Sequence, residues 1–336
     1  MFLVLSAGGS IHGGTGCFPE NRTAPDSSLL SRMCRKIATE KTAVHSILIL
    51  QNGELCFEKY FNGFERDSLQ LTYHVINSVI STLAGICIDN GLIKSVDQPV
   101  ITFFPEYIPV VQDTLQFRIT VKHLLTMTAG YQWESEHHDR EIAEFRDNPE
   151  LSAYLFQCPL AHRPGTVFSQ NSGGIYLLIK IIEKVSGKSL PEFMKERLFD
   201  PLQITRYKLA ADPAGRTKGP YALYLRPYDL IKLGSLFLNG QWNSKQLVSR
   251  EWMAEAIRPH VRLTPRFQAF RDLNAEGFGY CWWIFPDMFA ALGHSGQHLY
   301  ISQEHAVVVL VTGRMRFIAP AGLYRDYIRP ALSLQD

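Results

Sequence analysis

The chain has 336 residues, of which 46% are hydrophobic and 20% charged, the balance of an ordinary soluble globular protein. Its formal net charge is only +2 and no block of Lys or Arg stands out, so a nucleic-acid partner or an acidic membrane surface has little support. The six cysteines lie far apart, without a Cys-x-x-Cys pair or a Cys/His cluster. We therefore expect neither a metal site nor another cofactor.

The N-terminal residues give no targeting signal. The apolar run Met1–Leu5 lacks a basic flank and is shorter than the apolar core of a signal peptide. No stretch approaches the ~20 apolar residues of a membrane span. These features predict a cytoplasmic protein without a membrane span. Residues 1–25 are rich in Gly, Ser, Thr and Pro and predict a loosely ordered arm.

The first third of the remaining chain predicts a helix, a hairpin and a second helix. Residues 27–41 have the apolar spacing of an amphipathic helix. Two partly alternating apolar runs, 45–51 and 54–60, are separated by Asn52-Gly53, a dipeptide typical of a two-residue hairpin turn. Residues 73–90 are apolar on nearly every side, which predicts a buried helix that stops at Asn90-Gly91.

Later segments predict helices in the middle of the chain and strands near its end. Helices are expected at 177–185 and 228–238, strands at 279–285, 290–293, 299–302 and 306–312, and a closing helix at 320–332. Strands at both ends with helices between them predict one sheet assembled from both termini, an α/β (α+β) fold with a helical insertion. We expect a single domain over 26–336, with a sheet lobe (26–72 and 225–336) and a helical lobe (73–224).

Several ordered motifs resemble the β-lactamase-related serine hydrolases, a family of class C β-lactamases, esterases, penicillin-binding peptidases and 6-aminohexanoate-oligomer hydrolases. Tyr73–Val100 resembles the helix that carries the nucleophile in that family. The similarity continues through further segments: His123–Gly130, Pro164–Phe168, Tyr176–Gly187, Leu198–Leu202, Arg226–Gly234, Leu238–Trp242 and Gly293–Gln297. It covers about residues 30 to 330 and is nearest to the aminohexanoate-hydrolase and esterase branch. The resemblance implies an antiparallel sheet flanked by helices plus a mostly helical subdomain.

The resemblance also implies a particular acylation chemistry. Members of this family have a Ser at the start of the buried helix and a Lys one turn later, which takes the Ser proton because burial lowers its pKa. A Tyr-x-Asn motif passes the proton to the leaving group. A third motif, Lys or His followed by any residue and Gly, lines the acyl pocket and helps to form the oxyanion hole.

Most of these positions hold other residues in this chain. Aligned on the flanking motifs, the Ser position is His74 and the Lys position is Asn77. Gln170 and Ser172 stand at the Tyr-x-Asn positions. The third motif alone is kept, as His294-Ser295-Gly296. Ser-Lys acylation is therefore not expected.

The substituted residues suggest what the site could do instead. His74, Asn77 and His294 are the catalytic candidates, with His74 as a general base or as a hydrogen-bonding filler. Asn77 and Gln170 cannot exchange protons near neutral pH but can bind a polar ligand. Ser78 lies four residues after His74 and is more consistent with a small packing residue than with a nucleophile, since position 81 offers no Lys.

The remaining pocket candidates are Ser78, Ser172, Ser295, Gly296 and Trp133, although Trp133 could equally pack in the core. His137 and His138 are interpreted as a solvated or cleft-rim pair rather than as metal ligands. Three functions stay open: a binding or partner protein without turnover, an enzyme repurposed for acid/base chemistry with His74 as base, or a hydrolase that uses another residue. Each implies a small-molecule ligand or a partner at an interlobe cleft, and the oligomeric state is not indicated.

Overall fold

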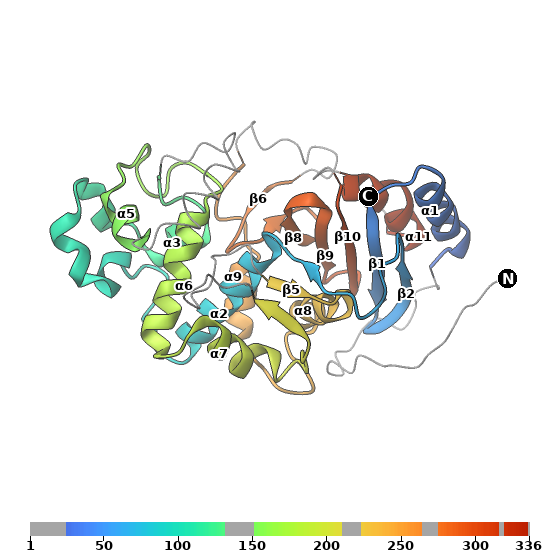
Figure 1. Cartoon of the computed structure of the whole chain (residues 1–336), viewed down its shortest axis with the longest axis horizontal. Coiled ribbons are helices and arrows are strands. Elements are labelled where there is room, and N and C mark those ends of the chain that lie inside the picture. Colours follow the sequence, from blue (N-terminus) through green and yellow to red (C-terminus); the bar gives the residue numbers. More distant parts are fainter. Residues whose placement is uncertain (1–24, 132–150, 210–222, 264–274, 316–318, 335–336) are drawn as a thin grey trace.

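A seven-stranded antiparallel sheet organises the molecule (Figure 1). The computed structural model describes residues 25–131, 151–209, 223–263, 275–315 and 319–334. The strands follow the order β2-β1-β10-β9-β8-β7-β6. Their bounds are β1 (Val44–Gln51), β2 (Glu54–Tyr60), β6 (Gly277–Phe278), β7 (Trp283–Ile284), β8 (Phe289–Gly293), β9 (Gln297–Ser302) and β10 (Val307–Gly313). Because β1 pairs with β10, the prediction of one sheet assembled from both ends is confirmed.

The predicted hairpin at Asn52-Gly53 is also confirmed. Both residues have positive φ, 53° and 82°, the conformation that a two-residue turn between right-twisted strands requires. β1 is almost fully buried, whereas β2 forms one edge of the sheet and alternates between exposed and half-buried residues.

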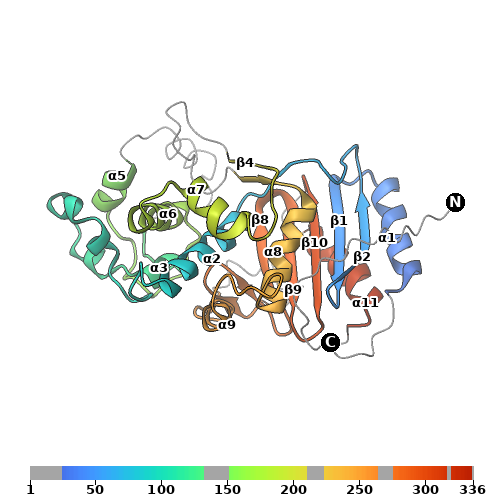
Figure 2. The same cartoon turned by 90° about the horizontal axis from the view of Figure 1, so that it is seen from below.

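Helices cover the two faces of the sheet (Figure 2). On one face α8 (Pro227–Asn239) contacts β1, β9 and β10, where the Cβ position of Gly234 meets Val308 and Leu299. Tyr300 points to the other face and stacks on Tyr324, with ring centroids 4.6 Å apart. That face is covered by α1 (Ser27–Thr39) and by a continuous C-terminal helical segment, which comprises α10 (Ala319–Leu323), η9 (Tyr324–Ile328) and α11 (Arg329–Ala331).

The other helices gather beyond the β6 end of the sheet (Figure 1). They include α3 (Val121–Leu125), α5 (Leu151–Gln157), α6 (Ser172–Ser186) and α7 (Leu190–Met194), followed by η5 (Lys195–Phe199). Three 3-10 turns precede α5: η1 (Val100–Phe103), η2 (Pro105–Val110) and η3 (Thr114–Arg118). Within the described ranges no helix is both long and apolar enough to cross a membrane.

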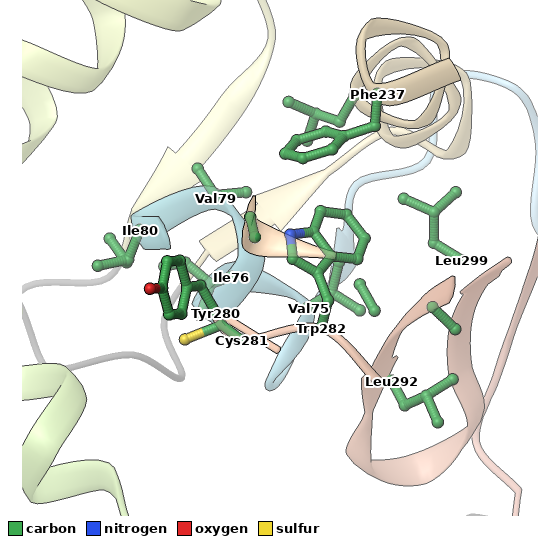
Figure 3. Close-up of a cluster of buried hydrophobic side chains, with 14 of the residues drawn as sticks. Val75, Ile76, Val79, Ile80, Phe237, Tyr280, Cys281, Trp282, Leu292 and Leu299 are labelled. Atoms are coloured by element: carbon green, nitrogen blue, oxygen red, sulfur yellow. The ribbon is translucent and has the colours of Figure 1, made fainter. Parts of the chain in front are cut away.

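The helix α2 (Val75–Asp89) joins these helices to the sheet, because it contacts α6 on one side and β8 and β9 on another. Figure 3 shows its apolar residues around Trp282, which lies between Val75 and Phe237. The Phe237 and Trp282 ring centroids are 4.5 Å apart. Every residue of α2 from Val75 to Cys87 is buried, as predicted from a segment that is apolar on nearly every side. The start of α2 is thereby fixed against the sheet.

The strand predicted at 279–285 is wrong. Only Trp283–Ile284 and the preceding Gly277–Phe278 are strand, and the chain turns tightly between them. The N–H of Gly279 donates to the carbonyl of Trp282 at 2.8 Å, and Cys281 has φ 63°. A Cβ at Gly279 would lie 2.2 Å from the carbonyl oxygen of Ala256, so the chain can approach this closely only at glycine.

A second, three-stranded sheet was not predicted. It has the order β3-β5-β4 and consists of β3 (Gln70–Leu71), β5 (Leu223–Leu225) and β4 (Tyr207–Leu209). Strands of two or three residues are too short for an alternating pattern to reveal them. This small sheet leads directly into the start of α2, because the Thr72 N–H donates to the carbonyl of Leu223 at 2.9 Å.

Candidate active site

The start of α2 lies against the end of β8. His74 is the N-cap residue of α2 and is only 8% exposed, and Tyr73 before it has φ 47°. A Cβ at Gly293, the last residue of β8, would lie 2.6 Å from the Thr72 carbonyl oxygen and 3.2 Å from a methyl of Val75. The structure thus brings His74 beside the turn that carries the third motif.

In that turn His294 is the exposed residue, and it contacts the segment before α2. Its ring lies edge-on to the ring of Tyr73, with centroids 5.7 Å apart. Sequence reasoning missed Tyr73, because nothing local marks a tyrosine as a neighbour of a distant histidine. The contact joins His294 to the residue that directly precedes the N-cap of α2.

Ser295 and Gly296 shape the turn between β8 and β9. Both have positive φ, 58° and 85°. The Ser295 carbonyl accepts the N–H of Met315 at 3.0 Å, and the Cβ position of Gly296 faces Met315 and Pro320. These contacts fix the turn against the segment that follows β10. Ser295 and Gly296 therefore determine the backbone shape of this side of the candidate site.

Asn77 lies one turn after His74, on the same side of α2. The residue is 5% exposed, and among the described residues its Oδ1 atom has no hydrogen-bond partner. The hydroxyl of Ser81, a further turn along, is likewise buried without a partner in the described part of the chain. An unpartnered buried polar atom lowers the free energy of unfolding by about 1–3 kcal/mol, so Asn77 is destabilising at this position as long as its oxygen has no partner.

The hydroxyl of Ser78 makes a buried hydrogen bond within the fold. Its hydroxyl donates to the carbonyl of Cys281 at 2.7 Å, and the residue is 4% exposed. The Thr82 hydroxyl donates back to the Ser78 carbonyl at 2.8 Å. This geometry supports the interpretation of Ser78 as a packing residue.

A chain of backbone contacts leads from α2 to the segment before α6. The N–H of Cys281 donates to the carbonyl of Leu125 at 2.9 Å, and the N–H of Ser169 donates to the carbonyl of Met127 at 2.9 Å. Gln170 follows directly and is half-buried. These contacts bring the third group of predicted residues toward the same part of the molecule.

The start of α6 is fixed by Asn171, which sequence reasoning also missed. Its Oδ1 accepts the N–H of Gly174 at 2.7 Å, and its Nδ2 donates to the carbonyl of Ser169 at 3.2 Å. An Asn just before a helix is a recognised capping signal, so the local sequence could have revealed it. Ser172, the first residue of α6, is 6% exposed.

Three remaining candidates cannot be placed. Trp133, His137 and His138 lie outside the described residues, as do residues 1–24 of the predicted arm. The candidate site therefore consists of His74 and Asn77 on α2, His294 to Gly296 on the β8–β9 turn, and Gln170 and Ser172 at the start of α6. Each of these side chains is neutral or an imidazole, so the groups favour hydrogen bonding over ion pairing.

Burial lowers the pKa of three imidazoles elsewhere in the fold, His45, His123 and His260. At His123 the neutral form is also required for a contact, because Nδ1 accepts the N–H of Thr120 at 3.1 Å. The unfolded chain binds protons at these residues from about pH 6.5 downward, whereas the folded chain binds them only at lower pH. Their contribution to stability is therefore complete above about pH 6.5 and is lost as the pH falls through the folded pKa values.

We expect denaturant unfolding at pH 7.5, 6.5 and 5.5 to give a free energy of unfolding that decreases toward acid. His123→Gln, which keeps an acceptor but cannot titrate, should reduce the slope over this range. A free energy of unfolding that rises on acidification would contradict the assignment.

Comparisons with known proteins agree with this architecture. The family model described as Beta-lactamase matches residues 35–330. The 6-aminohexanoate-dimer hydrolase of Paenarthrobacter ureafaciens is 24% identical over 289 residues, which are 81% of this chain and 72% of that protein.

Solved structures show the same fold. A Bacillus anthracis protein described as a 6-aminohexanoate-dimer hydrolase superposes with a TM-score of 0.75 at 20% identity, over 89% of this chain and 81% of that one. The octameric penicillin-binding protein homologue of Pyrococcus abyssi gives a TM-score of 0.70 at 20% identity, over 91% and 77% of the respective chains. The predicted penicillin-binding-protein-like fold is confirmed.

Proposed function

The chain belongs to the β-lactamase family, and on that basis we propose that it binds a small polar ligand without the acyl-serine chemistry of the family's hydrolases. The ligand would contain an acyl or amide group and would lie in a cleft between the start of α2, the β8–β9 turn and the start of α6. The 6-aminohexanoate-dimer hydrolase relative supports this class of ligand.

The observation that carries the proposal is the buried, unpartnered amide oxygen of Asn77. Asn77 stands where the resemblance places the lysine base, and an amide cannot accept a proton from a nucleophile near neutral pH. An amide can, however, donate and accept hydrogen bonds. A residue that lowers stability while unoccupied is typical of a binding site.

Ser78 offers no replacement nucleophile on α2. Its hydroxyl donates to the Cys281 carbonyl, and an attack on a substrate would require that buried contact to break. Ser78 also has no lysine at the position one turn later, where Ser81 stands. The contacts of Ser78 and the absence of a lysine at position 81 are therefore both consistent with the loss of acyl-serine chemistry.

The experiment is active-site labelling. We expect a fluorophosphonate probe to leave the intact mass of the protein unchanged, and p-nitrophenyl esters to be hydrolysed no faster than in buffer. Labelling of a serine, abolished when that serine is changed to Ala, would overturn the proposal. Ser78→Ala is the first variant to compare, since Ser78 is the hydroxyl nearest to His74 along α2.

A second candidate function is acid/base catalysis with His74 as the base. The imidazole makes no side-chain capping bond to α2, and it lies at the N-terminus of this 15-residue helix. Once a substrate is known, His74→Ala should abolish turnover under this hypothesis. Unchanged turnover across pH 5–8 would exclude His74 as the base and leave the binding function standing.

A further inference from the structure

We propose that Tyr73 is a ligand-binding residue of the proposed site, and that its hydroxyl donates a hydrogen bond to the carbonyl oxygen of a bound acyl or amide compound. This inference rests on the proposed function and adds the protein group by which the ligand is recognised.

The first observation is the backbone conformation of Tyr73. Its φ of 47° lies in the left-handed region, which bulky L-residues rarely adopt. Backbone hydrogen bonds hold the segment in place, because the Thr72 N–H donates to the carbonyl of Leu223 at 2.9 Å and the Tyr73 carbonyl accepts the N–H of Ile76 at 3.3 Å. Strained residues of this kind gather at functional sites and ligand clamps. Glycine would adopt the same conformation without steric cost, so the tyrosine side chain itself needs an explanation.

The second observation is where that side chain lies. Thr72 and His74, on either side of it, are buried, whereas Tyr73 is half-buried. Its ring lies edge-on to the ring of His294, which is exposed. A molecule that reaches the β8–β9 turn from solvent can therefore contact Tyr73 without a rearrangement of the buried core.

The third observation concerns the hydroxyl of Tyr73. Among the described residues it has no hydrogen-bond partner, and it is not one of the buried side-chain atoms that lack a partner. The hydroxyl is thus open to solvent, unlike those of Ser78 and Thr82 on α2, which both donate to backbone carbonyls. A phenol can donate a hydrogen bond that a carbonyl oxygen can only accept. Amides and esters both carry such an oxygen, so both are expected ligands.

The experiment uses three probes of nearly the same length: N-ethylbutanamide, ethyl butanoate and butyl ethyl ether. The ether keeps the chain and the linking oxygen of the ester and lacks only the carbonyl oxygen. Binding is measured by ligand-observed NMR titration. For the parent protein we expect the amide and the ester to bind roughly fivefold more tightly than the ether, the factor that corresponds to one net hydrogen bond.

Tyr73→Phe keeps the aromatic ring beside His294 and removes only the hydroxyl. This variant should bind all three probes within about twofold of one another. It should melt at the temperature of the parent protein, because the hydroxyl has no partner among the described residues. Tyr327→Phe is the matched control. Tyr327 is a half-buried tyrosine of η9, in the C-terminal helical segment on the sheet face opposite to α8, and its variant should keep the preference for carbonyl probes.

Each alternative outcome has a distinct meaning. If the parent protein shows no preference, or if Tyr73→Phe keeps it, the inference is overturned and the proposed binding function stands. The same holds if Tyr73→Phe weakens binding of the ether as much as that of the carbonyl probes. A lower melting temperature of Tyr73→Phe would assign the hydroxyl a structural role and would also overturn the inference. If none of the probes binds the parent protein, the proposed function itself fails for small acyl and amide compounds, and the inference fails with it.

Discussion

Returning the family's four residues to this frame should create reactivity toward a fluorophosphonate probe. The variant carries His74→Ser, Asn77→Lys, Gln170→Tyr and Ser172→Asn. The new hydroxyl would lie at the buried start of α2, and burial would lower the pKa of the new lysine one turn later, so that it can take the hydroxyl proton. A general base of this kind contributes about 10²–10⁴ to the rate, so labelling at least a hundredfold faster than in the parent is expected by intact mass.

The controls keep the serine but remove single parts. His74→Ser alone should label far more slowly, because Asn77 cannot act as its base. Adding Ser78→Ala to the fourfold variant should leave its labelling unchanged, since the Ser78 hydroxyl is bound to Cys281. If a fourfold variant that melts normally stays unlabelled, the geometry of the frame has diverged from that of active relatives.

A large effect on stability is expected at Gly85, in the middle of α2. A Cβ there would lie 2.4–2.6 Å from the indole ring of Trp252, a residue of α9 (Arg250–Ala256) that is 6% exposed. The indole cannot move away freely, because it also packs on Tyr280 with ring centroids 5.2 Å apart. Gly85→Ala should destabilise the protein by about 1–3 kcal/mol in denaturant unfolding, despite the better helix propensity of alanine.

A second change on α9 should reveal the mechanism of that destabilisation. In the Trp252→Leu background the added methyl has room. The loss in free energy of unfolding caused by Gly85→Ala should therefore fall to less than half. Gly322→Ala in α10 is the helical control, because its Cβ position has no neighbour within 4 Å and the change should be neutral or slightly stabilising. An additive double variant would show that Trp252 is not the source of the clash.

Much of the fold could be predicted because local signals decide it. Asn52-Gly53 forms a hairpin wherever two strands flank it, and the apolar pattern from Val75 onward can only belong to a buried helix. The run 279–285 is different. Every residue in it is apolar or glycine, so periodicity carries no information, and long-range contacts of Cys281 with Leu125 and Ser78 decide its conformation.

The same distinction applies to the candidate site. The resemblance identified His74 and Asn77, because their flanking residues align without a gap. It could not show that the hydroxyl of Ser78 is bound to a carbonyl 203 residues away, or that Tyr73 lies against His294. Those contacts depend on how α2 meets the sheet, and no local pattern encodes them.

The pairing of β1 with β10 has a consequence for the synthesis of the protein. Val44 pairs with Gly313 and Gln51 with Val307, so the central strands meet only after the long segment between them has been translated. At typical rates the delay is on the order of ten seconds or more, and pairing of such distant strands is slow in itself. Throughout this time the nascent chain exposes one edge of an apolar strand, a template for aggregation. We therefore expect the yield of the protein to depend on how well that edge is protected during synthesis.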